Sequence, residues 1–153
     1  MLSSLIRPQD GGDNDEVATT LSGGLHDERG WSSRLMWRKG GAGELYTYLP
    51  PSFSANQALC HIPPYSTSNP TYGTSVGRGS FFFQPGEWTT VTQRIRINDA
   101  GEENGELELF VDSQSRINVS GLVLRSSRAG RIRGMQIQTF FGGAFYLSCI
   151  ANS

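Results

Sequence analysis

Short runs in which apolar and polar residues alternate are the dominant pattern of this chain from residue 31 onward. The clearest run is TTVTQRIRIN, residues 89–98, where apolar residues share one parity and basic residues take the other: Val91, Ile95 and Ile97 against Arg94 and Arg96. Successive side chains of a strand point to opposite faces, so this run predicts a half-buried strand with a basic outer or groove face. Similar alternation predicts strands over 106–111, 117–119 and 135–139.

Turn residues separate these runs, and no stretch has a useful helical period. NDAG at 98–101 ends one strand, DSQS at 112–115 predicts a hairpin, and GG at 142–143 breaks the last run. Many short antiparallel strands are typical of two packed sheets. The sequence therefore predicts an all-β protein, an antiparallel β-sandwich of jelly-roll type. Residues 1–30 are polar and glycine-rich, and we predict loops there, with one short strand near 17–21.

Length, charge and cysteine content bound the possible functions. A chain of 153 residues fits one domain, and its net charge of −1 gives no general attraction to nucleic acid or a membrane surface. No apolar run approaches the roughly 18 residues of a membrane span. Two histidines and two cysteines form no metal motif, so we expect no cofactor and no metal. Cys60 and Cys149 could pair, and we expect a monomer.

A proline-, serine- and asparagine-rich connection runs from Leu49 to Gly79. At about 30 residues it is far longer than the usual connection between two strands. We predict an ordered functional loop or lid here, with a flexible insertion as the alternative.

The hairpin SSRLMWRKGGAGELYTYL, residues 32–49, carries the candidate site. We predict strands over 32–38 and 43–49, joined by residues 39–42. A register centred on Gly41 sets Arg34 opposite Tyr48 and Met36 opposite Tyr46. One face of the hairpin then carries Ser32, Arg34, Tyr46 and Tyr48. The opposite, core-facing row consists of Leu35, Trp37, Leu45 and Leu49.

An arginine beside two tyrosines on an open sheet face suits the chemistry of acidic sugars. Arginine can hold and neutralise a carboxylate, and twelve of the thirteen basic residues of this chain are arginine. Tyrosine can act as a general acid or base when a nearby cation lowers its pKa. These groups fit β-elimination on a uronic acid sugar, in which the α-proton leaves and the glycosidic oxygen is protonated. A plain binding or packing face is the alternative.

Several stretches of this sequence resemble polysaccharide lyase family 14. Ser32-x-Arg34 is followed, twelve residues after the arginine, by Tyr46-x-Tyr48. The other stretches, between about residues 11 and 143, are SRLMWRKGGAGELYTYLPP, NPTYG, VGRGSFFFQPGEWTTVTQRIRIND, GELELFVD and IRGMQIQTFFGG. The resemblance implies an extracellular β-jelly-roll enzyme that cleaves alginate or glucuronan by β-elimination, without a metal in the chemical step.

The resemblance also implies roles for individual residues. Arg34 would bind the uronate, Tyr46 and Tyr48 would serve proton transfer, and Ser32 would support the sugar or the arginine. We further infer a place along the same groove for Arg94, Arg96, Gln136 and Gln138. A solvated outer face for the two arginines, and unspecific sheet positions for the two glutamines, are the alternatives.

Both ends of the chain depart from the family pattern. The family uses a lysine upstream of the Ser-x-Arg pair, and aligning Gly11-Gly12 with the family's glycine pair puts Leu5 at that position. Arg7 is nearby, but arginine is too basic to replace a lysine in proton transfer. After Gly143 the sequence AFYLSCIANS replaces the expected long loop and closing strand. We therefore expect a domain shortened at both ends, with a sheet that is incomplete at the C-terminus.

These observations give one interpretation and two alternatives. We predict a divergent N-terminal segment (1–10), a lyase-like jelly-roll domain (11–143) and a divergent tail (144–153). The predicted function is cleavage of a uronate-containing polysaccharide by β-elimination. The alternatives are a noncatalytic jelly roll that binds acidic carbohydrate and an inactive remnant of a lyase.

Overall fold

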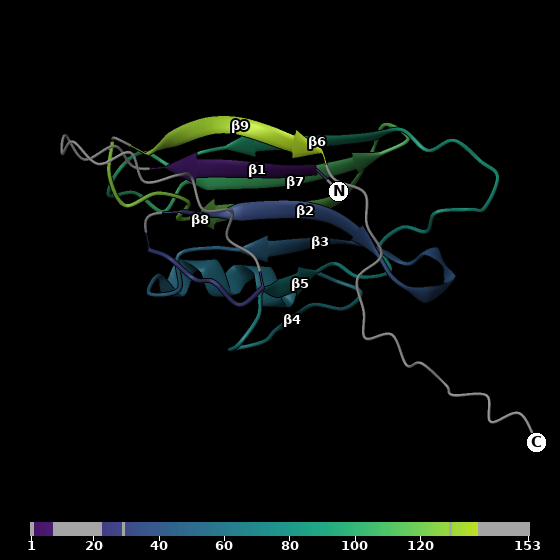
Figure 1. Ribbon diagram of the computed structural model, residues 1–153, viewed down its shortest axis with the longest axis horizontal. Coiled ribbons are helices and arrows are strands. Elements are labelled where there is room, and N and C mark those ends of the chain that lie inside the picture. Colours follow the sequence, from purple (N-terminus) through teal and green to yellow (C-terminus); the bar gives the residue numbers. More distant parts are fainter. Residues whose placement is uncertain (1, 8–22, 29, 129, 138–153) are drawn as a thin grey trace, which may run out of the picture.

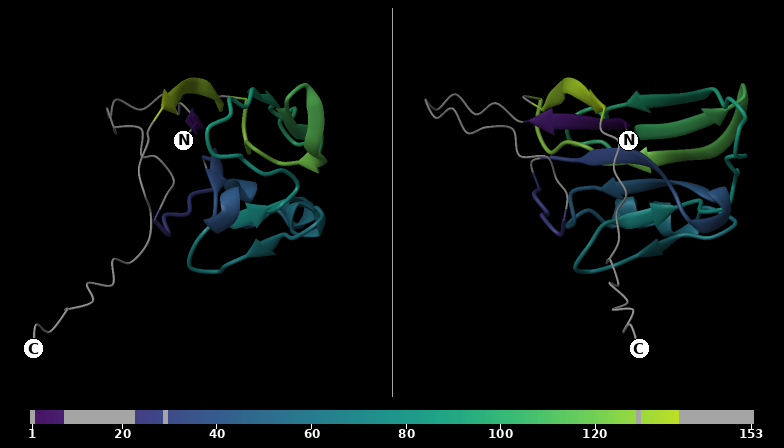
Figure 2. Two further views of the ribbon diagram at one scale, coloured as in Figure 1. Left: turned by 90° about the vertical axis from the view of Figure 1, so that its right-hand side faces the viewer. Right: turned by 45° about the vertical axis from the view of Figure 1, so that its right-hand side comes forward.

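Two antiparallel sheets pack face to face in the computed structural model, which describes residues 2–7, 23–28, 30–128 and 130–137 (Figures 1 and 2). The larger sheet has the strand order β4-β5-β3-β2-β1-β9 and the smaller one β6-β7-β8. The strands of the larger sheet are β1 (Leu2–Arg7), β2 (Ser32–Trp37), β3 (Gly43–Tyr48), β4 (Thr67–Ser68), β5 (Thr74–Val76) and β9 (Arg131–Ile137). Those of the smaller sheet are β6 (Val91–Arg96), β7 (Gly105–Val111) and β8 (Gln114–Leu122). The predicted β-sandwich of jelly-roll type is confirmed.

The hydrophobic core contains apolar side chains from both sheets and from the segments that connect their strands. Its buried members are Trp31, Leu45, Leu59, Val76, Phe81, Leu107, Leu109, Val111, Ile117, Val119, Leu122 and Leu124. The alternation of β6, β7 and β8 explains this core, because every second residue of these strands faces inward. The predicted hairpin between β7 and β8 forms, with Asp112 and Ser113 at positive φ in its turn.

A strand at the N-terminus replaces the predicted loop. β1 lies between β2 and β9 and pairs with both, with Leu5 in register with Ser32 and Ser3 with both Arg34 and Gln136. Sequence reasoning missed this strand because LSSLIR has only a weak period of two, whereas pairing on two sides satisfies its backbone groups. The short strand predicted near 17–21 lies outside the described residues.

The 49–79 connection is ordered and contains secondary structure of its own. It includes the 3₁₀ helix η2 (Ser54–His61) as well as β4 and β5. Asn56 fixes η2 to the sandwich, since its side chain donates to the carbonyl oxygens of Pro50 and Val123 and accepts from the Val123 N–H. Leu59 of the same helix enters the core. The structure therefore agrees with an ordered loop and not with a flexible insertion. Among the described residues, no helix is long and apolar enough to cross a membrane.

Candidate active site

The β2–β3 hairpin sets the candidate residues on one face, but with a register different from the prediction. Ser32 lies opposite Tyr48 and Arg34 opposite Tyr46, a shift of two residues. The turn causes the shift: Gly40 and Gly41 adopt positive φ in the short 3₁₀ helix η1 (Lys39–Gly41), and the Arg38 N–H donates to the Ala42 carbonyl oxygen. The hairpin is therefore centred on Gly40. A shift of two keeps every side chain on its predicted face.

The core-facing row of the hairpin differs from the prediction at Trp37. Leu45 is fully buried, and Leu35 and Leu49 pack against the core, whereas Trp37 is 51% exposed. Trp37 lies opposite Gly43, and the Phe81 ring lies so close to Gly43 that an added Cβ would stand 2.1 Å from it. Phe81 thus fills the inner space at this level. The Trp37 ring makes an edge contact with Phe83 at 5.5 Å instead.

The two tyrosines lie side by side, and neighbouring segments cover them. Their ring centroids are 5.8 Å apart in an edge contact. The Gly24 N–H donates to the Tyr48 hydroxyl oxygen at 3.3 Å, and the Gly73 N–H donates to that of Tyr46 at 3.1 Å. Tyr48 is only 2% exposed. The predicted open face is therefore wrong in this respect, because these two glycine segments close over the phenol groups.

Arg34 lies against Tyr48 on the same face. Its Cζ is 5.1 Å from the Tyr48 ring centroid, and the side chain is 6% exposed. Burial lowers the pKa of Arg34, and the charge and hydrogen bonding of Tyr48 oppose that effect. Arginine nevertheless stays protonated at neutral pH. The structure therefore provides a largely desolvated cation next to a phenol.

Tyr46 differs from an exposed tyrosine in its acidity. Burial raises its pKa above the usual 10.0, and the neighbouring Tyr48 raises it further, while the hydrogen bond from the Gly73 N–H acts in the opposite direction. The phenol of Tyr46 is therefore a weaker acid than that of an exposed tyrosine.

Glu44 is a further residue of this face, and sequence reasoning did not single it out. Its carboxylate is 0% exposed and accepts hydrogen bonds from Ser75 Oγ (2.6 Å), Arg38 Nε (2.8 Å) and Arg78 Nε (2.5 Å). Burial alone would raise the pKa of Glu44, but these three hydrogen bonds outweigh it and leave the pKa below 4.5. A signal was present, because Glu44 shares the parity of Tyr46 and Tyr48 in GELYTY.

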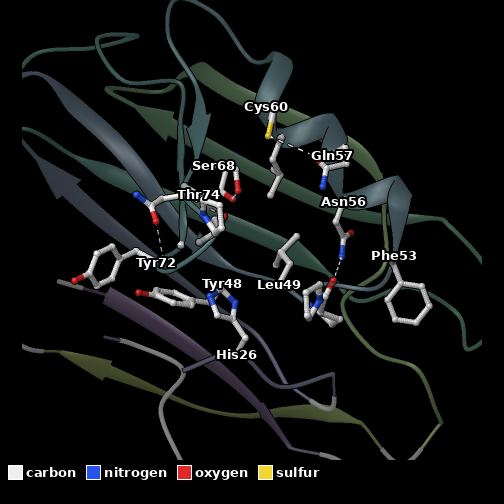
Figure 3. A pocket seen from close by; sticks show the side chains of 17 residues that line it. His26, Tyr48, Leu49, Phe53, Asn56, Gln57, Cys60, Ser68, Tyr72 and Thr74 are labelled. Carbon is white, nitrogen blue, oxygen red and sulfur yellow. Dashed lines mark hydrogen bonds between the residues drawn. The ribbon is translucent and has the colours of Figure 1, made fainter. Parts of the chain in front are cut away.

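A pocket of about 360 Å³ opens beside Tyr48 (Figure 3). Tyr48 and His26 lie on one side of it, and Asn56, Gln57 and Cys60 of η2 lie on the other. The His26 and Tyr48 ring centroids are 5.3 Å apart. The lining is mixed, with aromatic rings, amides and hydroxyls, as suits a sugar that has both polar groups and apolar ring faces. The 49–79 connection thus builds one wall of the cavity next to the site.

Arg94 and Arg96 lie far from the predicted groove. They belong to β6 of the smaller sheet and point to its exposed outer face, where Arg94 pairs with Glu106 and Glu108 and Arg96 with Glu106. Their inward neighbour Gln93 contacts β2 instead, donating to Ser33 Oγ at 2.7 Å. The structure therefore places both arginines on a solvated face, because the inner parity of β6 is used by the core.

Two other predicted features fall wholly or partly outside the described residues. Gln138 and Cys149 lie outside them, so the predicted groove position of Gln138 and a Cys60–Cys149 pair stay predictions. Cys60 is half-buried, and its thiol lies 3.8 Å from Gln57 Oε1. Among the described residues, no group of three or more histidine, cysteine or acidic side chains is arranged to hold a metal ion.

The fold is a jelly-roll sandwich, and its larger sheet carries an arginine beside two tyrosines. Both features are those that the resemblance to a polysaccharide lyase led us to expect. The family model for polysaccharide lyase 14 matches residues 9–146, and the chain belongs to this family. The predicted family is thus confirmed. The predicted boundaries of the lyase-like domain, after residue 10 and after residue 143, stay a prediction.

Two solved structures are similar to this chain. One is the marine family 14 alginate lyase from Aplysia kurodai, at 30% identity and a TM-score of 0.71 over 94% of this chain and 60% of that one. The other is an alginate lyase from Chlorella virus, at 18% identity and a TM-score of 0.61 over 86% of this chain and 57% of that one; this likeness shows the fold alone. This chain thus spans about 60% of the length of these relatives. No curated protein sequence matches it.

Proposed function

We propose that this protein cleaves a uronate-containing polysaccharide by β-elimination, with Arg34, Tyr46 and Tyr48 as its reacting groups. The observation that carries the proposal is the contact among these three side chains on one face of the β2–β3 hairpin. Membership of polysaccharide lyase family 14 supports a polysaccharide as the substrate.

The reaction needs a cation, a base and an acid. Arg34 would pair with the uronate carboxylate and stabilise the negative charge that develops when the α-proton leaves. Tyr48, whose ring lies against the Arg34 guanidinium, is suited to act as the base that accepts that proton. Tyr46, whose ring centroid lies 5.8 Å from that of Tyr48, is placed to donate its phenol proton to the glycosidic oxygen. The C–O bond breaks as the C=C bond forms, so no water and no oxidant is consumed.

The surroundings of the tyrosines would position the polymer. A sugar next to the cleaved bond would enter the pocket between Tyr48 and η2, which His26, Gln57 and Tyr72 also line. Ser32 is in register with Tyr48 and would support the sugar or Arg34 from the neighbouring strand. We propose alginate as the first substrate to test because the similar structure at 30% identity is an alginate lyase, with glucuronan as the second. A polymer of this kind also fits an extracellular protein.

A second candidate function is binding of an acidic polysaccharide without cleavage. The specific observation in its favour is the residue at position 5. Leu5 of β1 is in register with Ser32 of β2, which is in register with Tyr48 of β3. The position that the resemblance assigns to a lysine therefore lies beside the candidate residues. Leucine has no group that transfers a proton. A protein that retains Arg34 but cannot complete the proton transfers would bind and not cleave.

The test is an ultraviolet assay for the unsaturated uronate with polymannuronate, polyguluronate and glucuronan. We expect the wild-type protein to form this product and Tyr48→Phe to lower the rate by about 10² to 10⁴-fold, the usual contribution of a general acid or base. Tyr65→Phe is the matched control, because Tyr65 is exposed, does not line the pocket, and keeps its ring against Arg78 when only the hydroxyl is removed. No product from a cooperatively folded wild-type protein would overturn catalysis and leave the binding function.

A further inference from the structure

Glu44 joins two arginines on the tyrosine face of the larger sheet. Arg38 and Arg78 both donate through Nε to its carboxylate, and Ser75, which accepts from Arg78 Nη2 at 3.2 Å, donates to the same carboxylate. Glu44 is fully buried, whereas the side chains of Arg38 and Arg78 are 40% and 33% exposed. A buried carboxylate thus fixes two guanidinium groups whose outer parts reach solvent.

This cluster carries an excess of positive charge. Two arginines surround one carboxylate, in a protein whose net charge is −1. Each guanidinium has five N–H donors on three nitrogens. Arg38 uses Nε and Nη2 on Glu44, and Arg78 uses Nε on Glu44 and Nη2 on Ser75, so these contacts engage two nitrogens of each. The remaining donors of a fixed, planar fork are suited to a second carboxylate.

The cluster is next to the proposed reacting groups. Arg38 Cζ lies 5.8 Å from the Tyr46 ring centroid. Glu44 precedes Tyr46 by two residues on the same face of β3, which corresponds to about 7 Å along the strand. The cluster lies at the turn end of the hairpin and the pocket beside Tyr48 at the other end, so a polymer that crosses the tyrosines can contact both.

We infer that Arg38 and Arg78, oriented by Glu44, form a second carboxylate-binding subsite that holds a neighbouring uronate of the polymer bound at Arg34. This inference rests on the proposed function for the identity of the polymer. The charge complementarity is specific: a polyuronide carries a carboxylate on every sugar, while a neutral polysaccharide offers nothing to a guanidinium fork. The subsite selects for charge on the sugar next to the one that reacts.

Binding measured without turnover tests the subsite. In the Tyr48→Phe background, the affinity for polymannuronate is measured by calorimetry for Arg38→Gln and for Arg78→Gln. We expect each substitution to weaken binding about tenfold at low salt, because it removes one charge-assisted carboxylate contact. Arg116→Gln is the control, since Arg116 is an exposed arginine on β8 of the smaller sheet, and we expect it to leave affinity unchanged. Fully esterified alginate, which lacks the carboxylate charge, should bind weakly and equally to all variants.

The outcomes separate this subsite from the proposed catalysis. Tenfold weaker binding in the two variants supports the subsite even where the wild-type protein forms no unsaturated product, and then only catalysis is wrong. Affinity that is unchanged in both variants, or reduced equally in Arg116→Gln, overturns the subsite whether or not the protein is a lyase. If Arg38→Gln or Arg78→Gln melts without cooperativity, the same substitution combined with Glu44→Gln replaces it, because the double variant removes a cation and the buried anion together and should still lose affinity.

Discussion

Removal of the two arginines that pair with Glu44 should destabilise the fold more than removal of both arginines together with the Glu44 carboxylate. In Arg38→Gln/Arg78→Gln, the fully buried carboxylate keeps only the hydrogen bond from Ser75 Oγ. An unpaired buried charge typically costs about 3–5 kcal/mol. Here the cost has a ceiling, because Glu44 can take up a proton instead. At pH 7 that protonation costs about 3.4 kcal/mol, since each pH unit above the ordinary pKa of 4.5 costs about 1.36 kcal/mol.

The triple variant that also carries Glu44→Gln has no charge to bury. We therefore expect it to be more stable than the double variant by about 2–3 kcal/mol at pH 7, measured by urea unfolding monitored with tryptophan fluorescence. The difference should fall below about 1 kcal/mol at pH 4.5, where Glu44 is protonated at little cost. Equal stability of the two variants at pH 7, or a difference that does not change with pH, would refute the role of Glu44 as a buried anion.

Five further substitutions test the packing and the site. Trp31→Ala should cost about 3–5 kcal/mol in urea unfolding because Trp31 is fully buried, whereas Trp37→Ala, at a half-exposed residue, should cost less than about 1 kcal/mol. Asn98→Leu should cost more than about 3 kcal/mol, since the buried amide of Asn98 bonds to the backbone at five atoms between residues 99 and 125. Gly73→Ala should reduce lyase activity, because its Cβ would stand 2.4 Å from the Thr47 carbonyl oxygen and 2.8 Å from the Tyr48 ring. Gly86→Ala, at an open turn with positive φ, should cost about 1–2 kcal/mol of stability but leave activity unchanged.

The alternation of the sequence predicted the sheets and the faces of the hairpin, but not the finer geometry. A period of two fixes which residues share a face, so the placement of Arg34, Tyr46 and Tyr48 together survived an error of two residues in register. The same period cannot distinguish registers that differ by two. That choice depended on the conformation of Gly40 and Gly41 in the turn.

Other features depend on contacts between distant parts of the chain. Glu44 forms its cluster with Ser75 and Arg78, which are more than thirty residues away in the sequence. No local sequence pattern predicts such a cluster. The parity of Arg94 and Arg96 was predicted correctly, but whether that face lines a groove or meets solvent depended on which sheet β6 joins. The cover that the glycine segments provide over the tyrosines could not be predicted either. Residues 23–24 and 73 are distant from the tyrosines in the sequence and contact them only in the folded protein.

The mass of the products released from polymannuronate tests the central claim most directly. β-Elimination leaves a new chain end that is one water lighter than the end produced by hydrolysis. We predict that the wild-type protein releases oligosaccharides with this lighter end, and that Tyr48→Phe releases far fewer while Tyr65→Phe matches the wild type. Intact polymer, or products of the hydrolytic mass, from the folded protein would contradict β-elimination at this site.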